Sequence, residues 1–324
     1  MQMRAVVAEK FGEYENLKLV DIPKPVVSDG RVLVRVTAAG VTPLDHTILS
    51  GSFPLAKAPL VLGNEGVGIV EEGGDDQLPN GSRVAFTGPY GVFENGAFSE
   101  WVAVKKEHAH LVPDNVGDEA AGLPVAYLTA YLALRDAGFE AGKSVLAPAI
   151  GGSVGNAVAQ LARAMGAKHA VSTTTNSGKA VEAKRLGFSE VVDLSKESLA
   201  DGVRRLTAGH GVDIVIDGVG GDILSAELEA LAPGGSLTTL GYAASRYSTI
   251  DVTNLIWKGA TLKSFLLFNH PASAWAQAWK VTADLLKSGK IKPIVAQKFP
   301  LERTLDAIRH LVEGRPFGRV LVTM

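Results

Sequence analysis

The 324-residue chain contains no cysteine. Without a thiol the protein can form no disulfide, use no thiolate nucleophile and build no zinc site with thiolate ligands. An excess of charge of one sign is missing as well, because 32 basic residues are matched by 34 acidic ones and the formal net charge is −2. We therefore expect neither nucleic acid nor an anionic membrane to be a partner.

Long hydrophobic runs are also absent. The first residues, MQMRAVVAEKFG, lack the apolar centre of a signal peptide, and no apolar stretch is long enough to cross a bilayer. The sequence therefore predicts a soluble cytoplasmic protein. Its length suits two domains, and its 36 glycines and 46% hydrophobic residues are typical of an α/β enzyme.

The stretch 144–167 combines a strand, a glycine-rich turn and a helix. An apolar run leads into the turn around Gly152 and Gly155, and an amphipathic pattern follows from Asn156. Backbone N–H groups and the positive dipole end at such a helix start attract a pyrophosphate. A purely structural turn is the alternative, because Ile150 stands where the G-x-G-x-x-G motif has its first glycine. The candidate pyrophosphate-binding residues are Gly152, Ser153, Val154 and Gly155.

Apolar segments recur after this turn, and helical stretches lie between most of them. This alternation predicts an α/β fold with a doubly wound parallel sheet. The first third of the chain instead shows many short strands separated by Gly, Pro and Asn, which predicts a β-rich domain. The apolar segments are 169–173, 191–194, 213–217, 236–240 and 261–265, and two helices at 272–287 and 301–312 and a strand at 319–322 end the chain.

The residues after the second strand of the predicted parallel sheet select the cofactor. NAD-preferring folds place Asp or Glu there, about twenty residues past the glycines, to hold the ribose 2′-hydroxyl. The span 172–178 holds only Ser, Thr, Asn and Gly, and Lys179 follows it. Thr173, Thr174 and Lys179 are therefore candidates to bind a 2′-phosphate, which favours NADPH. The alternative is that the span only makes a turn and caps the next helix, and the two roles can coexist.

Eight short motifs follow one another in a characteristic order. They are GVTPLDHTILSG (40–51), PLVLGNEGVGIVEEGG (59–74), GAFSEWVAV (96–104), LPVAYLTAYLAL (123–134), the glycine turn, DIVIDGVGG (213–221), APGGSLTTLG (232–241) and GRVLVTM (318–324). Over nearly its whole length the chain resembles the medium-chain dehydrogenase/reductase superfamily, and within it the zinc-independent quinone oxidoreductase (zeta-crystallin-like) branch.

The resemblance implies three segments and an assembly. These are a GroES-like catalytic domain over 1–122, a Rossmann NADP-binding domain over 123–265 and a C-terminal return to the catalytic domain over 266–324. It also implies a homodimer in which the edge strand Thr261–Phe265 pairs with its two-fold mate. The alternative is a monomer whose edge is protected by Lys263.

The resemblance also bears on a metal. Zinc-dependent members of the superfamily carry a catalytic Cys where Thr42 stands and a His where Asn64 stands, and Glu65 alone cannot make a site that needs three or four ligands. His108 and His110 lie in the polar segment KKEHAH, which predicts a solvated strand end. We therefore expect no bound metal, and hydride transfer without a Lewis acid.

By the same resemblance, the nicotinamide lies in a cleft between the domains, with the loop 42–46 on one side and the stretch 265–269 on the other. The family's NADPH users have a lysine at the place of Lys179. Where quinone reductases often have Asn and Tyr, this chain has Thr42 and Thr47, so its substrate is open. The implied lining residues are Thr129, Gly218, Gly241, Tyr242, Phe265 and Phe268.

Four candidate catalytic residues result: Thr42, Asp45, Thr129 and Tyr242. Asp45 is expected to hold its loop rather than to transfer protons. For Thr129, a buried helix hydroxyl that bonds to the preceding turn is an equal alternative. Tyr242 and Tyr90 are either proton donors or packing residues with a wet hydroxyl.

Together these expectations describe an NADPH-dependent oxidoreductase that transfers hydride to a quinone or an α,β-unsaturated carbonyl without a metal. Such acceptors take hydride readily and solvent can protonate the product, which agrees with the lack of a strong general acid. An enoyl or 2-alkenal C=C reductase is one alternative. A non-catalytic NADPH-binding protein is another, since the cofactor motifs would be the same.

Overall fold

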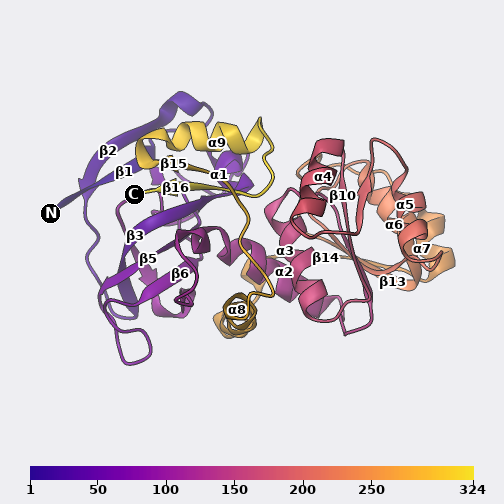
Figure 1. Cartoon of the computed structure of the whole chain (residues 1–324). Coiled ribbons are helices and arrows are strands. Elements are labelled where there is room, and N and C mark those ends of the chain that lie inside the picture. The colour runs from indigo at the N-terminus through magenta and orange to yellow at the C-terminus, as the bar shows by residue number, and fades with distance from the viewer. The chain divides into compact units, whose positions relative to one another are not determined.

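The computed structural model describes residues 1–324, and the chain divides into two compact units (Figure 1). Unit 1 comprises Met1–Val125 and His270–Met324, and unit 2 comprises Ala126–Asn269. Unit 2 is therefore a continuous segment inserted into the sequence of unit 1. None of the helices combines the length and the apolar character that a membrane crossing needs.

Unit 1 is built mainly from two β-sheets. The smaller sheet has the strand order β2-β1-β4, and the larger has the order β15-β16-β3-β5-β6-β8 with β7 paired to β3. The strands are β1 (Gln2–Ala8), β2 (Leu17–Pro23), β3 (Arg31–Val41), β4 (Leu60–Val61), β5 (Glu65–Glu72), β6 (Arg83–Thr87), β7 (Trp101–Lys105), β8 (Ala109–Leu111), β15 (Val295–Pro300) and β16 (Arg319–Thr323). Its α-helices are α1 (Pro43–Leu49), α8 (Ala272–Lys287) and α9 (Thr304–Val312).

The interior of unit 1 joins both of its chain segments. Val34 and Val36 of β3 share one buried cluster with Ile308 of α9 and Val320 of β16. Burying each aliphatic side chain of this size contributes about 1.5–3 kcal/mol. The C-terminal segment is thus part of the same core as the N-terminal strands.

The expectation of a solvated strand end at His108 and His110 is wrong. His110 is only 7% exposed, and its ring stacks on Trp279 of α8 with 5.5 Å between centroids. The His108 ring lies 5.2 Å from that of Trp275, and its Nδ1 is 3.1 Å from the hydroxyl of Tyr90. The local sequence is polar, but a helix from the C-terminal segment covers it, which no local pattern reveals.

Unit 2 contains one six-stranded sheet in which every neighbouring pair is parallel. The strand order is β11-β10-β9-β12-β13-β14, which confirms the predicted doubly wound parallel sheet. The strands are β9 (Ser144–Ala147), β10 (His169–Thr174), β11 (Val191–Asp193), β12 (Val212–Asp217), β13 (Leu231–Thr239) and β14 (Thr261–Ser264). Their apolar residues, such as Leu146, Val171, Val215 and Leu237, form one buried cluster.

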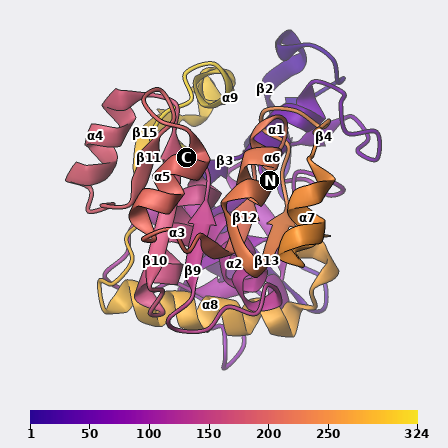
Figure 2. The same ribbon diagram turned by 90° about the vertical axis from the view of Figure 1, so that its right-hand side faces the viewer.

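Helices connect the strands of unit 2 (Figure 2). They are α2 (Pro124–Asp136), which begins at the boundary with unit 1, α3 (Ser153–Ala164), α4 (Ser177–Arg185), α5 (Leu199–Leu206), α6 (Ile223–Ala230) and α7 (Val252–Lys258). Since parallel crossovers are right-handed, α3 and α4 cover one face of the sheet and α5, α6 and α7 cover the other. The sequence pattern did not predict α5, α7 or β15.

Candidate active site

The candidate cofactor residues follow the carboxyl ends of the strands in unit 2. Strand β9 pairs with β10 on one side and β12 on the other, so the winding of the sheet reverses between β9 and β12. Ligands of open α/β sheets bind at such a switch point, beyond the carboxyl ends of the strands. Gly152, Ser153, Val154 and Gly155 follow β9; Thr173, Thr174 and Lys179 end or follow β10; Gly218 follows β12; Gly241 and Tyr242 follow β13; Phe265 and Phe268 follow β14.

The glycine turn after β9 brings a helix N-terminus close to the strand. A Cβ atom on Gly155 would lie 2.4 Å from the carbonyl oxygens of both Pro148 and Ala149, so only glycine fits there. Gly152 precedes the first residue of α3, and a Cβ atom there would lie 3.2 Å from the Ala149 oxygen. Ala149, the residue before Ile150, adopts φ 60°, a positive φ that glycine favours. The turn thus forms without a glycine at Ile150.

Two threonines at the end of β10 accept hydrogen bonds from N–H groups of the neighbouring loops. Thr173 is buried, and its hydroxyl oxygen accepts a hydrogen bond of 3.1 Å from the N–H of Ala149, which ties the glycine turn to β10. The Thr174 hydroxyl accepts from the N–H of Asn176 at 3.2 Å. Both hydroxyls therefore shape the loops that would face a dinucleotide.

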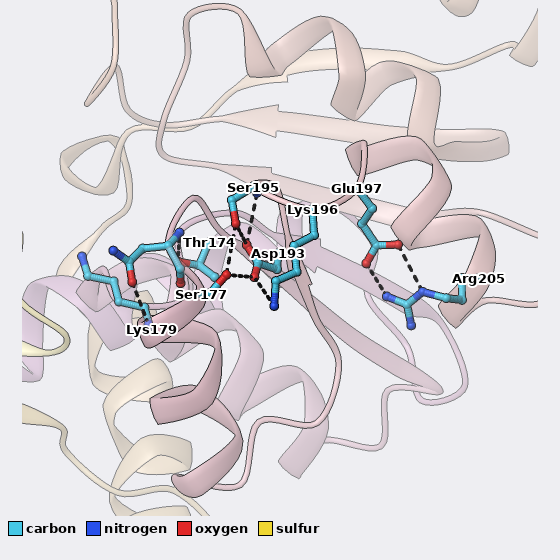
Figure 3. A network of polar contacts seen from close by, with 9 residues as sticks. Thr174, Ser177, Lys179, Asp193, Ser195, Lys196, Glu197 and Arg205 are labelled. Carbon is cyan, nitrogen blue, oxygen red and sulfur yellow. Dashed lines mark hydrogen bonds and ion pairs between the residues drawn. The ribbon is translucent and has the colours of Figure 1, made fainter.

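Helix α4 begins at Ser177 with a side-chain cap. The Asn176 side-chain oxygen accepts from the N–H of Lys179 at 3.1 Å, so the predicted alternative of a capping turn is present. Figure 3 shows a contact that the sequence did not suggest: the Ser177 hydroxyl donates to the carboxylate of Asp193 over 2.5 Å. Asp193 is the last residue of β11. Its place at a strand end was the only sequence signal that could have identified it.

The loops after β12 and β13 approach each other closely. A Cβ atom on Gly241 would lie 2.6 Å from the carbonyl oxygen of Gly218, so the two loops touch through their backbones. The buried Asp217 carboxylate holds the first loop by accepting from the N–H groups of Val219 and Gly220 at 2.6 and 3.0 Å. Burial raises the pKa of this carboxyl.

Side chains beyond these loops differ in exposure. Tyr242 is 56% exposed and Phe268 is 42% exposed, whereas Phe265 is mostly buried. Thr129 on α2 is buried, yet its hydroxyl makes no bond to the carbonyl four residues earlier. The hydroxyl of Thr282, in contrast, does so at 2.9 Å. Thr129 therefore lacks the hydrogen bond that would explain a buried helix hydroxyl.

In unit 1, Thr42 and Asp45 form a reciprocal cap at the start of α1. The Asp45 carboxylate accepts from the N–H of Thr42 at 2.7 Å, from its hydroxyl at 2.9 Å and from the N–H of Gly63 at 2.9 Å. Burial raises the pKa of Asp45 to about 6, although these three donors oppose the shift. Both side chains are thus engaged in holding the loop between β3 and α1.

The neighbouring polar residues Asn64 and Glu65 are also buried. The Glu65 carboxylate accepts from the N–H of Val125 at 2.7 Å and forms an ion pair with Arg319 of β16. No group of three or more His, Asp or Glu side chains stands close enough to hold a metal ion.

Tyr90 lies in the interior as well, where its hydroxyl accepts from the N–H of Lys105 at 2.7 Å and burial raises its pKa.

Both parts of the chain match known protein families. Residues 28–114 match the alcohol dehydrogenase GroES-like domain, and residues 153–284 match the zinc-binding dehydrogenase family. The chain is 29% identical to human quinone oxidoreductase over 322 residues, which is 96% of this chain and 94% of that protein. It is 28% identical to an Arabidopsis thaliana NADPH-dependent alkenal/one oxidoreductase, over 99% of this chain and 79% of that protein. A solved Pseudomonas syringae quinone oxidoreductase superimposes with a TM-score of 0.87 at 30% identity, covering 99% of this chain and 100% of that one.

Proposed function

Because the chain belongs to the medium-chain dehydrogenase/reductase superfamily, in its quinone oxidoreductase branch, we propose that it transfers hydride from NADPH to a quinone or an α,β-unsaturated carbonyl. The observation that carries this proposal is that the candidate cofactor residues lie at or after the carboxyl ends of the strands of one parallel sheet, beside its switch point. We further propose that it works without a metal.

The residues at the carboxyl ends of these strands fit a dinucleotide. When bound, NADPH supplies the hydride. The N–H groups at the start of α3 would bind the pyrophosphate, and Gly152 leaves space for it to approach the backbone. Gly218 and Gly241 let the loops after β12 and β13 pack closely against each other, and Tyr242 and Phe268 would limit access of water. Positioning of this kind can lower a barrier by about 7–11 kcal/mol.

The proposed preference for NADPH rests on the end of β10. The span 172–178 carries no carboxylate, and Lys179 lies in the first turn of α4, where the helix dipole also favours an anion. Charge-assisted contacts to a 2′-phosphate would favour NADPH by about 2–4 kcal/mol. Dissociation constants of NADPH and NADH for the wild type and Lys179→Ala measure this preference. Equal affinities in the wild type contradict it.

The proposal of a metal-free reaction rests on how the polar residues of unit 1 are used. The carboxylate of Asp45 is bound by Thr42 and Gly63, and that of Glu65 by Arg319 and Val125. Neither carboxylate is left to act as a metal ligand. Stoichiometric zinc by elemental analysis, with activity removed by a chelator and restored by the metal, would refute the proposal.

Among the hydroxyls, Thr129 is the best candidate to polarise the acceptor carbonyl or the carboxamide, because it lacks an internal partner. Thr42 is less free, since its hydroxyl donates to Asp45. We expect Thr129→Val to lower kcat/KM by a factor of about 10–100 with NADPH binding unchanged. A loss of four or more orders of magnitude would instead make this hydroxyl a catalytic acid.

Two measurements test the reaction itself. A panel of quinones, enals and enoyl thioesters, assayed by NADPH oxidation, separates quinone reduction from C=C reduction, and the enone relative makes the second candidate worth testing. NADPH deuterated at C4 on each face in turn then reports the transfer. With an enone as the acceptor, one face should deliver deuterium to the β-carbon of the product, where it does not exchange with water. Absence of turnover with every acceptor, despite NADPH binding, would leave the non-catalytic alternative.

We also propose a homodimer that forms along the edge of the unit 2 sheet. Strand β14 is the last strand of the sheet, and the neighbouring helix α7 exposes Ile256 and Trp257, the latter to 84%. Lys263, the one charged residue of β14, donates to the carbonyl of Asp136 in its own unit, so it does not guard the edge. Sedimentation at micromolar concentration decides, and a monomer mass ends this proposal. Location in the cytoplasm stays a prediction from the sequence.

A further inference from the structure

Strand β11 brings a carboxylate to the end of β10. In the parallel register Thr174 pairs with Asp193, the last residue of β11. Asp193 is only 8% exposed, and one carboxylate oxygen accepts from the Ser177 hydroxyl at 2.5 Å. The other oxygen accepts from the hydroxyl of Ser195 at 2.6 Å and from its N–H at 3.1 Å. The carboxylate thus lies directly beside the first residue of α4 (Figure 3).

This carboxylate is negatively charged at any physiological pH. The hydroxyls of Ser177 and Ser195 lower the pKa of Asp193 to about 2. The nearest cation is the ammonium of Lys196 at 3.6 Å, on a side chain that is 70% exposed. Because this ammonium stays in contact with water, salt and solvent screen its attraction and it cancels little of the charge of Asp193.

The position of this charge matters for a 2′-phosphate. The carboxyl end of the second strand is where Rossmann folds recognise the 2′ position of the ribose, and an acidic residue there selects NADH. In this chain no acidic residue occurs within 172–178, but Asp193 ends the neighbouring strand opposite Thr174. The Ser177 hydroxyl donates its only proton to Asp193 and therefore presents lone pairs, not a donor, to a phosphate.

We infer that Asp193 is a specificity-determining residue whose carboxylate weakens binding of the 2′-phosphate and so limits the preference for NADPH over NADH. The inference rests on the proposed function, because it requires the ribose of a dinucleotide at the end of β10. Lys179 and Asp193 then act in opposite directions on the same phosphate, and the observed preference is their balance.

Binding of two cofactors and two fragments tests the inference. Dissociation constants of NADPH, NADH, 2′,5′-ADP and 5′-AMP are measured by calorimetry for the wild type, Asp193→Asn and Asp193→Ser. In both variants NADPH and 2′,5′-ADP should bind about tenfold more tightly, the effect of removing one like charge from a partly screened site. NADH and 5′-AMP should change less than about twofold. The gain should shrink at high salt, which a mere change of packing would not produce.

Two control variants separate charge from structure. Glu197→Gln makes the same change of charge four residues along the chain, where Arg205 already pairs with the carboxylate at 2.5 Å, and should leave the ratio of affinities unchanged. Ser177→Ala removes the hydroxyl but keeps the charge of Asp193, and should not raise the preference for NADPH. Circular dichroism confirms that each variant is folded.

The outcomes distinguish the two proposals. An unchanged or lower NADPH preference in both folded Asp193 variants overturns the inference, and a lower one would mean that Asp193 orients phosphate-binding groups. A wild type that prefers NADH contradicts the proposed cofactor, while a shift toward NADPH on removing Asp193 still supports the inference. A wild type that binds neither cofactor overturns both.

Discussion

The burial of His110 makes a quantitative prediction about acid stability. Burial, assisted by nearby His108, lowers the pKa of His110 from 6.5 to about 4. In the unfolded chain this histidine takes up a proton near pH 6.5, whereas the folded protein keeps it neutral to about pH 4. The stabilisation is therefore present above pH 6.5 and is lost as the pH falls toward 4. The loss amounts to about 3 kcal/mol.

The substitution His110→Phe isolates this effect. A phenyl ring can stack on Trp279 as the imidazole does, and the Nε2 atom it replaces is buried without a hydrogen-bond partner. We expect His110→Phe to be at least as stable as the wild type at pH 7. Near pH 4, its advantage in unfolding free energy should be about 3 kcal/mol larger than at pH 7. Asp45, whose pKa is raised, gives a slope of the opposite sign, but it is common to both proteins.

Urea unfolding between pH 4 and 8, followed by tryptophan fluorescence, measures the difference in unfolding free energy between the two proteins. His210→Gln is the matched control, because it replaces a histidine whose side chain is 60% exposed. Parallel stability curves for the wild type and His110→Phe over this range would refute the reasoning. The imidazole would then be solvated or protonated in the folded protein.

Three further sets of variants test other contacts. Gly155→Ala should destabilise by about 1–3 kcal/mol, since its methyl group would meet two carbonyl oxygens at 2.4 Å, and Gly152→Ala should cost less in the same thermal denaturation. Glu227 is fully buried without hydrogen bonds, and burial raises its pKa well above 4.5, so wild-type stability falls as the pH rises above that value. The substitution Glu227→Met should therefore raise the unfolding free energy more at pH 8 than at pH 5. Equal effects at the two pH values in urea unfolding would contradict this. Arg319→Met leaves the Glu65 carboxylate buried and unpaired and should cost about 3–5 kcal/mol by chemical denaturation, most of which the added change Glu65→Met should restore.

Local patterns in the sequence were enough for the features that depend on neighbouring residues. The glycine turn and its helix were predicted because Gly152, Gly155 and the apolar face of α3 lie within one short stretch. The cap of α1, which was not predicted, also joins near neighbours, since Thr42 and Asp45 are three residues apart and hold each other. The parallel sheet followed from the regular alternation of apolar and helical segments.

Features that depend on distant residues could not be predicted in this way. Asp193 lies at the end of β10 only because β11 is the neighbouring strand in the sheet. The order of strands in a sheet cannot be inferred from local sequence patterns. The stacking of His110 on Trp279 joins residues from the two separate segments of unit 1. Helix α5 was missed because it is short and rich in charged residues, although Ser198 caps it.

The pairing of β16 with β3 has a consequence for how the protein is made. Val41 lies opposite Val320, so the larger sheet of unit 1 joins residues from near the two ends of the chain. The ribosome synthesises all of unit 2 before it synthesises β16. The large sequence separation between β3 and β16 makes loop closure costly and slows this pairing. During synthesis residues 38–41 of β3 therefore lack their β16 partner while unit 2 can already fold. A chaperone that shields an exposed strand would act on this intermediate, and removal of the last six residues would make the waiting state permanent.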